Sequence, residues 1–157
     1  MSVRKFLKDD REIIIEYIKK TNVFNPEEVD IAIELIDIFL EDEKQTDYEL
    51  FVYEDDEKKT QGYICIGKTP ATDGTFDLYW IAVNPEKQNL GIGKQLLNYS
   101  ENELRNSGGK LLIAETSSTE KYFNTRKFYD ACRFEKLVQI KNYYRTDDDL
   151  IIYGKYI

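Results

Sequence analysis

The chain has 157 residues, a length that fits one domain with a hydrophobic core, and its formal net charge is −8. That charge argues against a nucleic-acid partner, because nucleic-acid binding normally needs a basic face. The chain has no His, its two cysteines lie far apart, and no apolar run is long enough to cross a membrane, so we expect no metal site, no disulfide framework and no membrane partner.

The first half of the chain predicts helices with clear start signals. Asp9 and Glu12 suggest a capping box for one helix, and Asn25 followed by Pro26 suggests the start of a second. The second helix is apolar on more than one stripe, so we expect it to be buried on two sides or to border a groove or a second subunit. The predicted elements are a strand over 3–7, helices over 8–21 and 25–43, and a hairpin over 48–68.

The second half predicts an alternation of strands and helices around a nearly continuous apolar strand, which is typical of a central strand. The predicted elements are that strand over Thr75–Val83, a helix over Ile92–Asn106, a strand over 110–116, a helix over 119–132, and strands over 134–144 and 149–157. The order predicts an α/β (α+β) domain over residues 1–157, with a mixed central sheet of six to seven strands and helices on both faces.

The segment after the central strand has features of a phosphate-binding loop. Gly91 and Gly93 precede and open a helix whose first N–H groups have no partner inside the helix, and no carboxylate lies from Lys87 to Leu97. The segment matches neither the Walker loop nor the dinucleotide-binding fingerprint. Two glycines that let a helix pack tightly on a strand remain the alternative explanation.

A longer pattern carries a family resemblance. Gln88-x-x-Gly91-x-Gly93, following the apolar strand, resembles the acetyl-CoA signature [QR]-x-x-G-x-[GA] of the GNAT acetyltransferase superfamily. The segment "TRKFYDACRFEKL" resembles a later helix and strand of that family, and the predicted element order matches the whole domain. The resemblance implies a GNAT fold in which splayed central strands form the acyl-CoA cleft, and an acetyl-CoA-dependent N-acetyltransferase that uses no metal.

The resemblance also implies roles for individual residues in holding the cosubstrate. The backbone of the central strand should bind the pantetheine arm, the amides of the loop should hold the pyrophosphate, and Gln88 should help to order that loop. The cofactor-binding residues expected are Ile81, Ala82, Val83, Gln88, Asn89, Leu90, Gly91, Ile92, Gly93, Lys94, Asn124, Phe128 and Tyr129. For Asn124, capping of its helix is the alternative.

The catalytic residues expected from the resemblance are Tyr129, Asp77 and Ile81. Tyr129 matches the general acid that protonates the thiolate leaving group, and the Ile81 amide would stabilise negative charge on the thioester oxygen. Asp77 is a candidate base, with Glu115, Tyr79 and a water relay as alternatives. Arg133 departs from the family pattern, which has Gly at this point, so the helix of Tyr129 is expected to end differently.

The acceptor is expected to be an amine that an acidic protein attracts, although solubility alone also explains the charge. The resemblance places its site in residues 21–28 and 141–149, where Tyr143, Tyr144 and Arg145 accompany Asp147–Asp149. A non-catalytic acyl-CoA-binding module and a purely structural α/β domain are the alternatives. We expect a cytoplasmic protein, because the N-terminus lacks a secretory signal, and a homodimer is left open.

Overall fold

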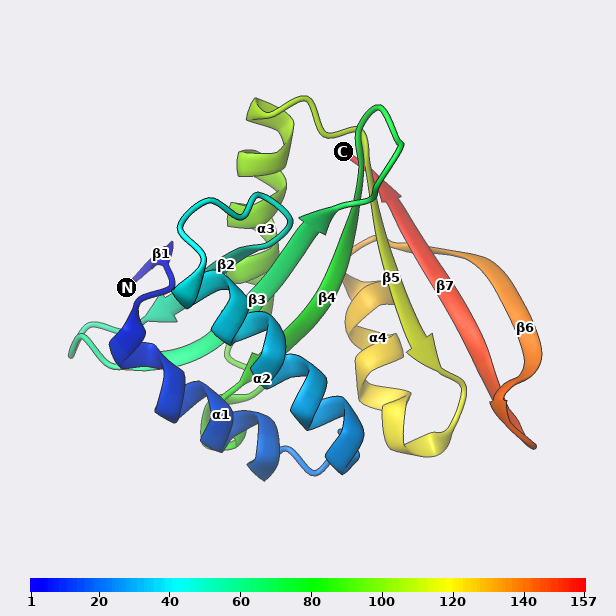
Figure 1. Cartoon of the computed structure of the whole chain (residues 1–157). Coiled ribbons are helices and arrows are strands. Elements are labelled where there is room, and N and C mark those ends of the chain that lie inside the picture. Colours follow the sequence, from blue (N-terminus) through cyan, green and yellow to red (C-terminus); the bar gives the residue numbers. More distant parts are fainter. The chain divides into compact units, whose positions relative to one another are not determined.

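The computed structural model describes residues 1–157, all of the chain (Figure 1). The predicted α/β class is confirmed, since four α-helices accompany seven strands hydrogen-bonded in the order β1-β2-β3-β4-β5-β7-β6. The helices are α1 (Arg11–Lys20), α2 (Pro26–Glu41), α3 (Ile92–Asn106) and α4 (Phe123–Ala131). The strands are β1 (Ser2–Lys5), β2 (Glu49–Glu54), β3 (Thr60–Lys68), β4 (Thr75–Val83), β5 (Leu111–Ser117), β6 (Glu135–Arg145) and β7 (Asp148–Tyr156).

The chain forms two compact units. The first comprises Met1–Gly67 and Tyr79–Glu103, and the second comprises Lys68–Leu78 and Leu104–Ile157. Strand β4 and helix α3 each contribute residues to both units. The assignment of one domain to residues 1–157 stays a prediction.

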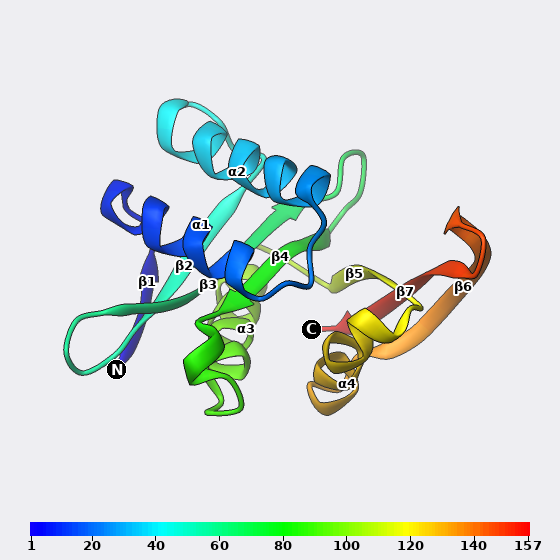
Figure 2. The same ribbon diagram turned by 90° about the horizontal axis from the view of Figure 1, so that it is seen from below.

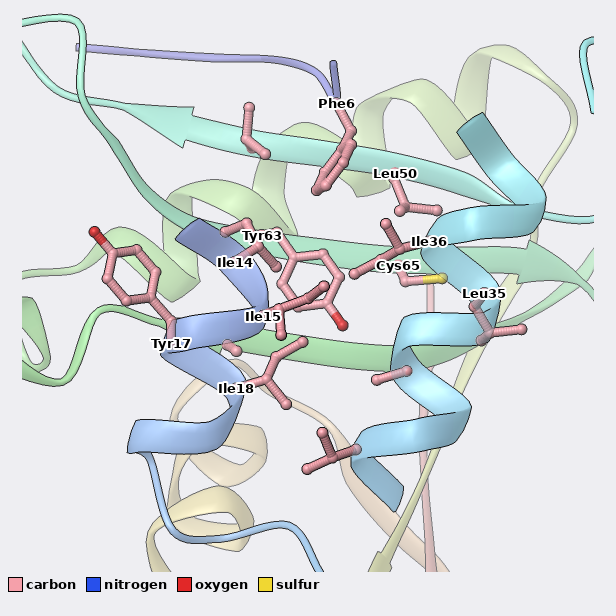
Figure 3. Close-up of a cluster of buried hydrophobic side chains, with 14 residues drawn as sticks. Phe6, Ile14, Ile15, Tyr17, Ile18, Leu35, Ile36, Leu50, Tyr63 and Cys65 are labelled. Atoms are coloured by element: carbon pink, nitrogen blue, oxygen red, sulfur yellow. The ribbon is translucent and has the colours of Figure 1, made fainter. Parts of the chain in front are cut away.

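In the first unit, α1 and α2 pack on the antiparallel strands β2 and β3 (Figure 3), and β1 pairs antiparallel with β2. The buried faces of both helices, together with the inward side chains of β2 and β3, form one apolar cluster. Trp80 of β4 packs against this cluster and Ala82 belongs to it. Helix α2 buries Val29, Ala32, Leu35 and Ile36, while Ile31 is 50% exposed, so α2 is buried mainly along one face.

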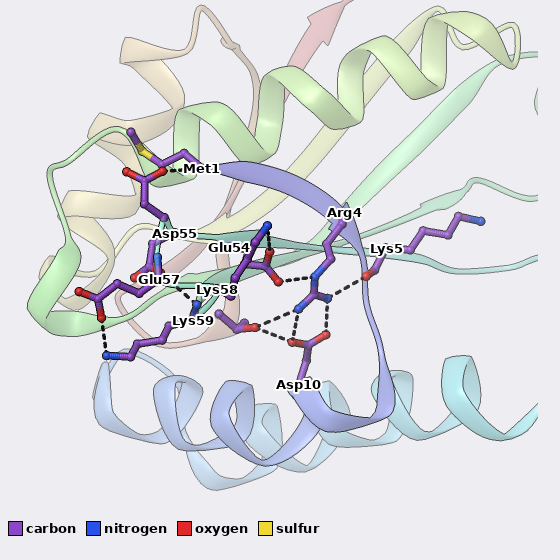
Figure 4. Close-up of polar contacts among 11 residues, drawn as sticks. Met1, Arg4, Lys5, Asp10, Glu54, Asp55, Glu57, Lys58 and Lys59 are labelled. Atoms are coloured by element: carbon purple, nitrogen blue, oxygen red, sulfur yellow. Dashed lines mark hydrogen bonds and ion pairs between the residues drawn. The ribbon is translucent and has the colours of Figure 1, made fainter.

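A polar network fixes the start of α1 (Figure 4). Arg4 binds both carboxylate oxygens of Asp10, at 2.8 and 3.0 Å, and the Asp10 carboxylate accepts a further hydrogen bond from the Leu7 amide at 2.8 Å. The expected capping box of Asp9 and Glu12 is therefore wrong. A short 3₁₀ turn over Lys8–Asp10 precedes the helix, and Asp10 makes the capping contact because its carboxylate is already held by Arg4.

In the second unit, β4 pairs in parallel with β5 over Thr75–Leu78, and β7 pairs antiparallel with both β5 and β6 (Figure 2). Helix α4 packs on β7, where the Tyr129 and Tyr153 rings lie 5.3 Å apart. The helix begins at Phe123, four residues later than expected, since Glu120–Tyr122 form a 3₁₀ turn.

Several turns depend on left-handed backbone at residues other than glycine. Asparagine and aspartate tolerate this conformation, because their short side chains bond locally. Lys58, Ala71 and Arg133 have no such advantage, and their φ angles are 64°, 60° and 66°. No helix combines the length and the apolar character needed to cross a membrane.

Candidate active site

The candidate phosphate-binding loop joins β4 to α3 within the first unit. Asn84 ends the strand: its amide donates to the Gln61 carbonyl at 2.8 Å and its side-chain oxygen accepts from the Glu86 amide at 3.1 Å. The chain then passes through Asn89 at φ 62° and Gly91 at φ 81° before α3 begins at Ile92, as predicted. The Asn84-Pro85 pair marks the end of the strand in the sequence, and the structure adds that Asn84 orders the loop through these contacts.

The loop presents an open surface to an anion. A side chain at Gly91 would meet no atom within 4 Å, and residues 86–91 are exposed. The N–H groups of the first helical turn have no acceptor within the helix, and the helix dipole adds partial positive charge at this end. Lys94 is exposed in the first turn of α3, which contains no acid. These features fit the pyrophosphate of coenzyme A.

The Gln88 side chain is exposed, and its expected part in ordering the loop stays a prediction. The Asn84 turn also shapes the loop, and in it the Lys87 amide donates to the Asn84 carbonyl at 2.8 Å. The cosubstrate contact expected of Gln88 likewise stays a prediction.

The end of β4 is held closely against β3. A Cβ at Gly62 of β3 would lie 2.9 Å from the Ala82 carbonyl oxygen, so only glycine permits this approach. Trp80 and Ala82 face the apolar cluster. Alternation along the strand therefore puts Ile81 and Val83, both half-buried, on the opposite face. Strand β4 pairs with β5 from Thr75 to Leu78, which lies opposite Ala114.

Tyr129 lies in an aromatic environment in the second unit. Its side chain is 3% exposed, and its ring lies 5.2 Å from Phe134, 5.3 Å from Tyr153 and 5.7 Å from Phe128. Burial raises the pKa of the Tyr129 hydroxyl, with smaller contributions from Cys132 and Tyr153. The hydroxyl therefore keeps its proton throughout the physiological pH range.

The helix of Tyr129 ends as a glycine-terminated helix would, so the expectation of a different ending at Arg133 is wrong. Arg133 adopts the left-handed conformation, its amide donates to the Asp130 carbonyl at 3.1 Å, and the Phe134 amide donates to the Tyr129 carbonyl at 3.0 Å. This pair of hydrogen bonds is the Schellman motif. Arg133 adopts this geometry although its side chain makes the left-handed conformation unfavourable.

Arg126 ties α4 to the end of β5. Its Nη1 donates to the carbonyl oxygens of Ser117 at 2.8 Å and Thr119 at 2.7 Å. The Ser117 hydroxyl in turn donates to Asp148 of β7 at 2.5 Å. The sequence analysis missed both anchors, because their partners are backbone atoms or residues distant in the chain. Asn124 is exposed in the first turn of α4 and is not its cap, since Tyr122 occupies that position.

Asp77, the candidate base, is half-buried on β4 opposite Ile113 of β5. Its carboxylate accepts a hydrogen bond from the Thr69 hydroxyl at 2.6 Å. Glu115, the alternative, is exposed on β5. Both carboxylates are placed in the second unit.

The β6–β7 hairpin uses much of its acidic run internally. Asp148 is buried and pairs with Ser117, and Asp149 accepts hydrogen bonds from the Asn142 amide at 2.9 Å and Gln139 at 2.6 Å. The Asn142 amide, and then Gln139, lower the pKa of Asp149. Tyr143 remains exposed there, with its ring 5.1 Å from Tyr144. Two of the acids expected to attract an amine, Asp148 and Asp149, thus accept hydrogen bonds within the protein.

Comparison with known proteins identifies the family. A model of the acetyltransferase (GNAT) domain matches residues 46–136. The chain belongs to the GNAT acetyltransferase family. A crystal structure described as a GNAT-family acetyltransferase from Desulfovibrio desulfuricans is 40% identical, with 99% of this chain and 98% of that chain covered and a TM-score of 0.90. No curated protein matches the chain.

More distant GNAT structures share the fold alone. An aminoglycoside 6′-N-acetyltransferase complexed with coenzyme A is 15% identical, covers 99% of this chain and 97% of its own, and has a TM-score of 0.77. The ribosomal-protein-S18-alanine N-acetyltransferase from Escherichia coli is 20% identical, with 99% and 93% covered and a TM-score of 0.74. Family membership makes the chain an acetyltransferase.

Proposed function

We propose that the chain is an acetyl-CoA-dependent N-acetyltransferase that transfers the acetyl group directly to a primary amine. The observation that carries the proposal is the loop before α3, where Gly91 at φ 81° leaves an open, acid-free surface over the first turn of the helix. This surface suits a diphosphate, which is the anionic part of coenzyme A.

Binding would rest mainly on backbone groups. The amides of Asn89–Lys94 would hold the pyrophosphate, and the backbone of Ile81, Ala82 and Val83 would hold the pantetheine arm. Bound acetyl-CoA would supply the thioester carbonyl carbon that the amine attacks. The Ile81 amide, fixed by the strand, would donate to the carbonyl oxygen as negative charge develops there.

Tyr129 would act as the general acid for the thiolate leaving group, while Phe128 and Asn124 would contact the arm. An acid must hold its proton until the transfer, and the raised pKa of Tyr129 meets that condition. The rings of Phe128, Phe134 and Tyr153, which lie within 5.7 Å of its ring, limit the positions that its side chain can adopt.

The amine must lose a proton before attack, and Asp77 would accept it, directly or through water. The hydrogen bond from the Thr69 hydroxyl orients this carboxylate. Glu115 and Tyr79 are the alternatives. Asp77→Asn should shift the pH–rate profile if Asp77 is the base, whereas Glu115→Gln should not.

The acceptor would be a small amine or a peptide amine. The related structures include enzymes named for aminoglycosides and for a ribosomal-protein alanine, so both classes occur on this fold. The acidity of the chain favours a cationic acceptor and disfavours a nucleic-acid partner. We further propose that the protein acts in the cytoplasm, without a metal and as a homodimer.

A non-catalytic acyl-CoA-binding module is the second candidate, because the loop before α3 serves both functions and a buried tyrosine also occurs in ordinary cores. A broad amine screen with acetyl-CoA, followed by release of free thiol, separates the two. Turnover with any amine supports the enzyme, while cosubstrate binding without turnover by any amine favours the module.

Calorimetric titration with acetyl-CoA tests the site itself. We expect a dissociation constant on the micromolar scale, about −8 kcal/mol. Gly91→Leu should abolish binding, because its side chain would enter the open surface. Gly108→Leu is the matched control, since Gly108 has φ 83° and equally open surroundings but lies after α3. Equal losses in both variants would show that strain alone explains the effect.

A further inference from the structure

A chain of side-chain hydrogen bonds connects the turn between β2 and β3 to the loop before α3. The Gln61 side chain donates from Nε2 to the Asp55 carboxylate at 2.7 Å, and its Oε1 accepts from Asn84 Nδ2 at 2.8 Å. The Asn84 Oδ1 in turn accepts from the Glu86 amide at 3.1 Å. All four residues belong to the first unit, and Figure 4 shows Asp55 in its turn.

Asn84 uses all of its hydrogen-bonding groups in this arrangement. Its backbone amide donates to the Gln61 carbonyl, and its backbone carbonyl accepts from the Lys87 amide, both at 2.8 Å. Its Nδ2 also donates to the Tyr17 hydroxyl at 3.4 Å. If the side-chain amide were rotated by 180°, Nδ2 would face the Glu86 N–H group. Two donors would then oppose each other, so only one orientation of the amide preserves the turn.

Asp55 fixes that orientation, because a carboxylate accepts hydrogen bonds but does not donate them. Its Oδ1 accepts from the amides of Glu57 and Lys59, at 2.9 and 3.0 Å, which leaves Oδ2 for Gln61. The Lys59 amide, and then the Gln61 side chain, lower the pKa of Asp55, so the carboxyl is ionised at neutral pH. Gln61 is 6% exposed, so water offers it few other partners. Its Nε2 must face Asp55, and its Oε1 therefore faces Asn84.

We propose that Asp55 and Gln61 are positioning residues for acetyl-CoA binding and act through Asn84. The direction of the hydrogen bonds is set at Asp55 and passes through two side-chain amides to the Glu86 N–H group. It fixes the turn that leads into the loop whose amides would hold the pyrophosphate. Neither residue would contact the cosubstrate. The inference rests on the proposed function, and it adds two residues from the β2–β3 hairpin to those that determine acetyl-CoA affinity.

Exchanging the acid and the amide tests the direction of the hydrogen bonds. In D55N/Q61E the new amide at position 55 donates to the new carboxylate at position 61, which still accepts from Asn84. Asp55→Asn alone makes two donors oppose each other, whichever way its amide turns, and Gln61→Glu alone brings two carboxylates together. In calorimetric titrations with acetyl-CoA, we expect each single variant to raise the Kd about tenfold. The double variant should return to within about twofold of the native Kd.

Charge alone predicts a different pattern. Asp55→Asn removes a negative charge and would strengthen the binding of an anion, Gln61→Glu adds one and would weaken it, and D55N/Q61E leaves the net charge unchanged. Gln45→Glu is the matched control. The Gln45 side chain also makes two hydrogen bonds in the first unit, but both join it to the Tyr48 backbone in the loop after α2. This variant should keep the native affinity for acetyl-CoA.

Two further measurements separate positioning from a general loss of stability. In steady-state kinetics, the KM for acetyl-CoA should rise in the single variants while kcat stays within about twofold of the native value. In the protein without ligand, hydrogen exchange of the Glu86 amide should be faster in the single variants and native in D55N/Q61E. If Gln61→Glu does not fold, Gln61→Met provides a second route, since it removes both side-chain hydrogen bonds without adding charge. It should raise the Kd, and adding Asp55→Asn should raise it no further.

Three results would overturn the proposal: native Kd values in both single variants, additive losses in D55N/Q61E, or an equal loss in Gln45→Glu. If the native protein itself failed to bind acetyl-CoA, the proposed function would fall, and with it this role of Asp55 and Gln61. Native binding that the single variants leave unchanged would reject the positioning role alone.

Discussion

The amide of Phe134 donates a hydrogen bond to the carbonyl of Tyr129 at 3.0 Å, and their rings lie 5.2 Å apart. The two residues therefore contact each other through both backbone and side chain, as the first and last members of a Schellman motif. Arg133, between them, adopts φ 66° to make this possible. The position of the candidate acid thus depends on a strained residue that is not itself part of the chemistry.

Replacing Arg133 with glycine should stabilise the protein. Glycine adopts positive φ without the steric cost of a side chain, which is on the order of 1 kcal/mol, and its greater freedom in the unfolded state offsets part of that gain. We expect a rise of about 0.5–1 kcal/mol in the free energy of unfolding, measured by chemical denaturation. Arg133→Ala removes the charge but keeps the strain, so an equal gain in that variant would contradict the backbone explanation.

Tyr129→Phe should lower kcat by roughly a hundredfold and leave acetyl-CoA affinity almost unchanged, because the hydroxyl donates its proton only during transfer. Steady-state kinetics with an amine found in the screen, combined with calorimetry, measures both. Tyr153→Phe is the control, since Tyr153 packs 5.3 Å from Tyr129. Unchanged turnover in Tyr129→Phe would mean that another group or water protonates the thiolate.

Tyr63→Phe should leave the protein equally stable or more stable. The Tyr63 hydroxyl is fully buried and has no hydrogen-bond partner among the protein's atoms, and burial raises its pKa. Tyr17→Phe is the matched comparison, because the Tyr17 hydroxyl donates to the Thr60 carbonyl at 3.1 Å. That variant should lose about 1 kcal/mol. A greater loss in Tyr63→Phe than in Tyr17→Phe, by thermal unfolding, would reject this account.

Asp10 should contribute an acid-sensitive part of the stability. Burial opposes its ionisation, but hydrogen bonds from Arg4, Thr60 and the Leu7 amide outweigh burial and lower its pKa. A carboxyl whose pKa is lower in the folded state stabilises the protein above the unfolded value, about 3.9, and this stabilisation is lost as pH falls through the folded value.

The difference in unfolding free energy between the native protein and Asp10→Asn isolates this contribution from the other carboxylates. We expect the difference to be constant from neutral pH down to about pH 5 and to shrink below about pH 4. Denaturation curves over this range provide the measurement. Parallel pH dependence of the two proteins across the acid range would contradict it.

Local patterns predicted much of the fold. The helix over Ile92–Asn106 and the strand over Thr75–Val83 have the predicted bounds, because glycine, proline and asparagine mark their ends. The capping of α1 was not predictable from local sequence, since Asp10 of the 3₁₀ turn depends on Arg4 of strand β1. The left-handed Arg133 was also missed, because tertiary packing outweighed its backbone preference.

The sequence likewise predicted some features of the candidate site and not others. The sequence predicted the glycine loop before α3, because an anion site of this kind would depend on backbone amides and on the absence of side chains. The contacts of Asn84 and Arg126 were not predicted, because each residue bonds residues distant in the chain or carbonyl groups. The hydrogen bonds of Asp148 and Asp149 also could not be predicted. An acidic run has the same sequence whether its carboxylates face solvent or accept hydrogen bonds within the protein.

Lys58, Ala71 and Arg133 occupy left-handed turns that glycine or asparagine would fill at lower cost. Together they represent on the order of 3 kcal/mol of avoidable backbone strain, a sizeable share of the stability of an average domain. Stabilising changes at these turns would therefore offset destabilising substitutions introduced elsewhere in the chain by protein engineering.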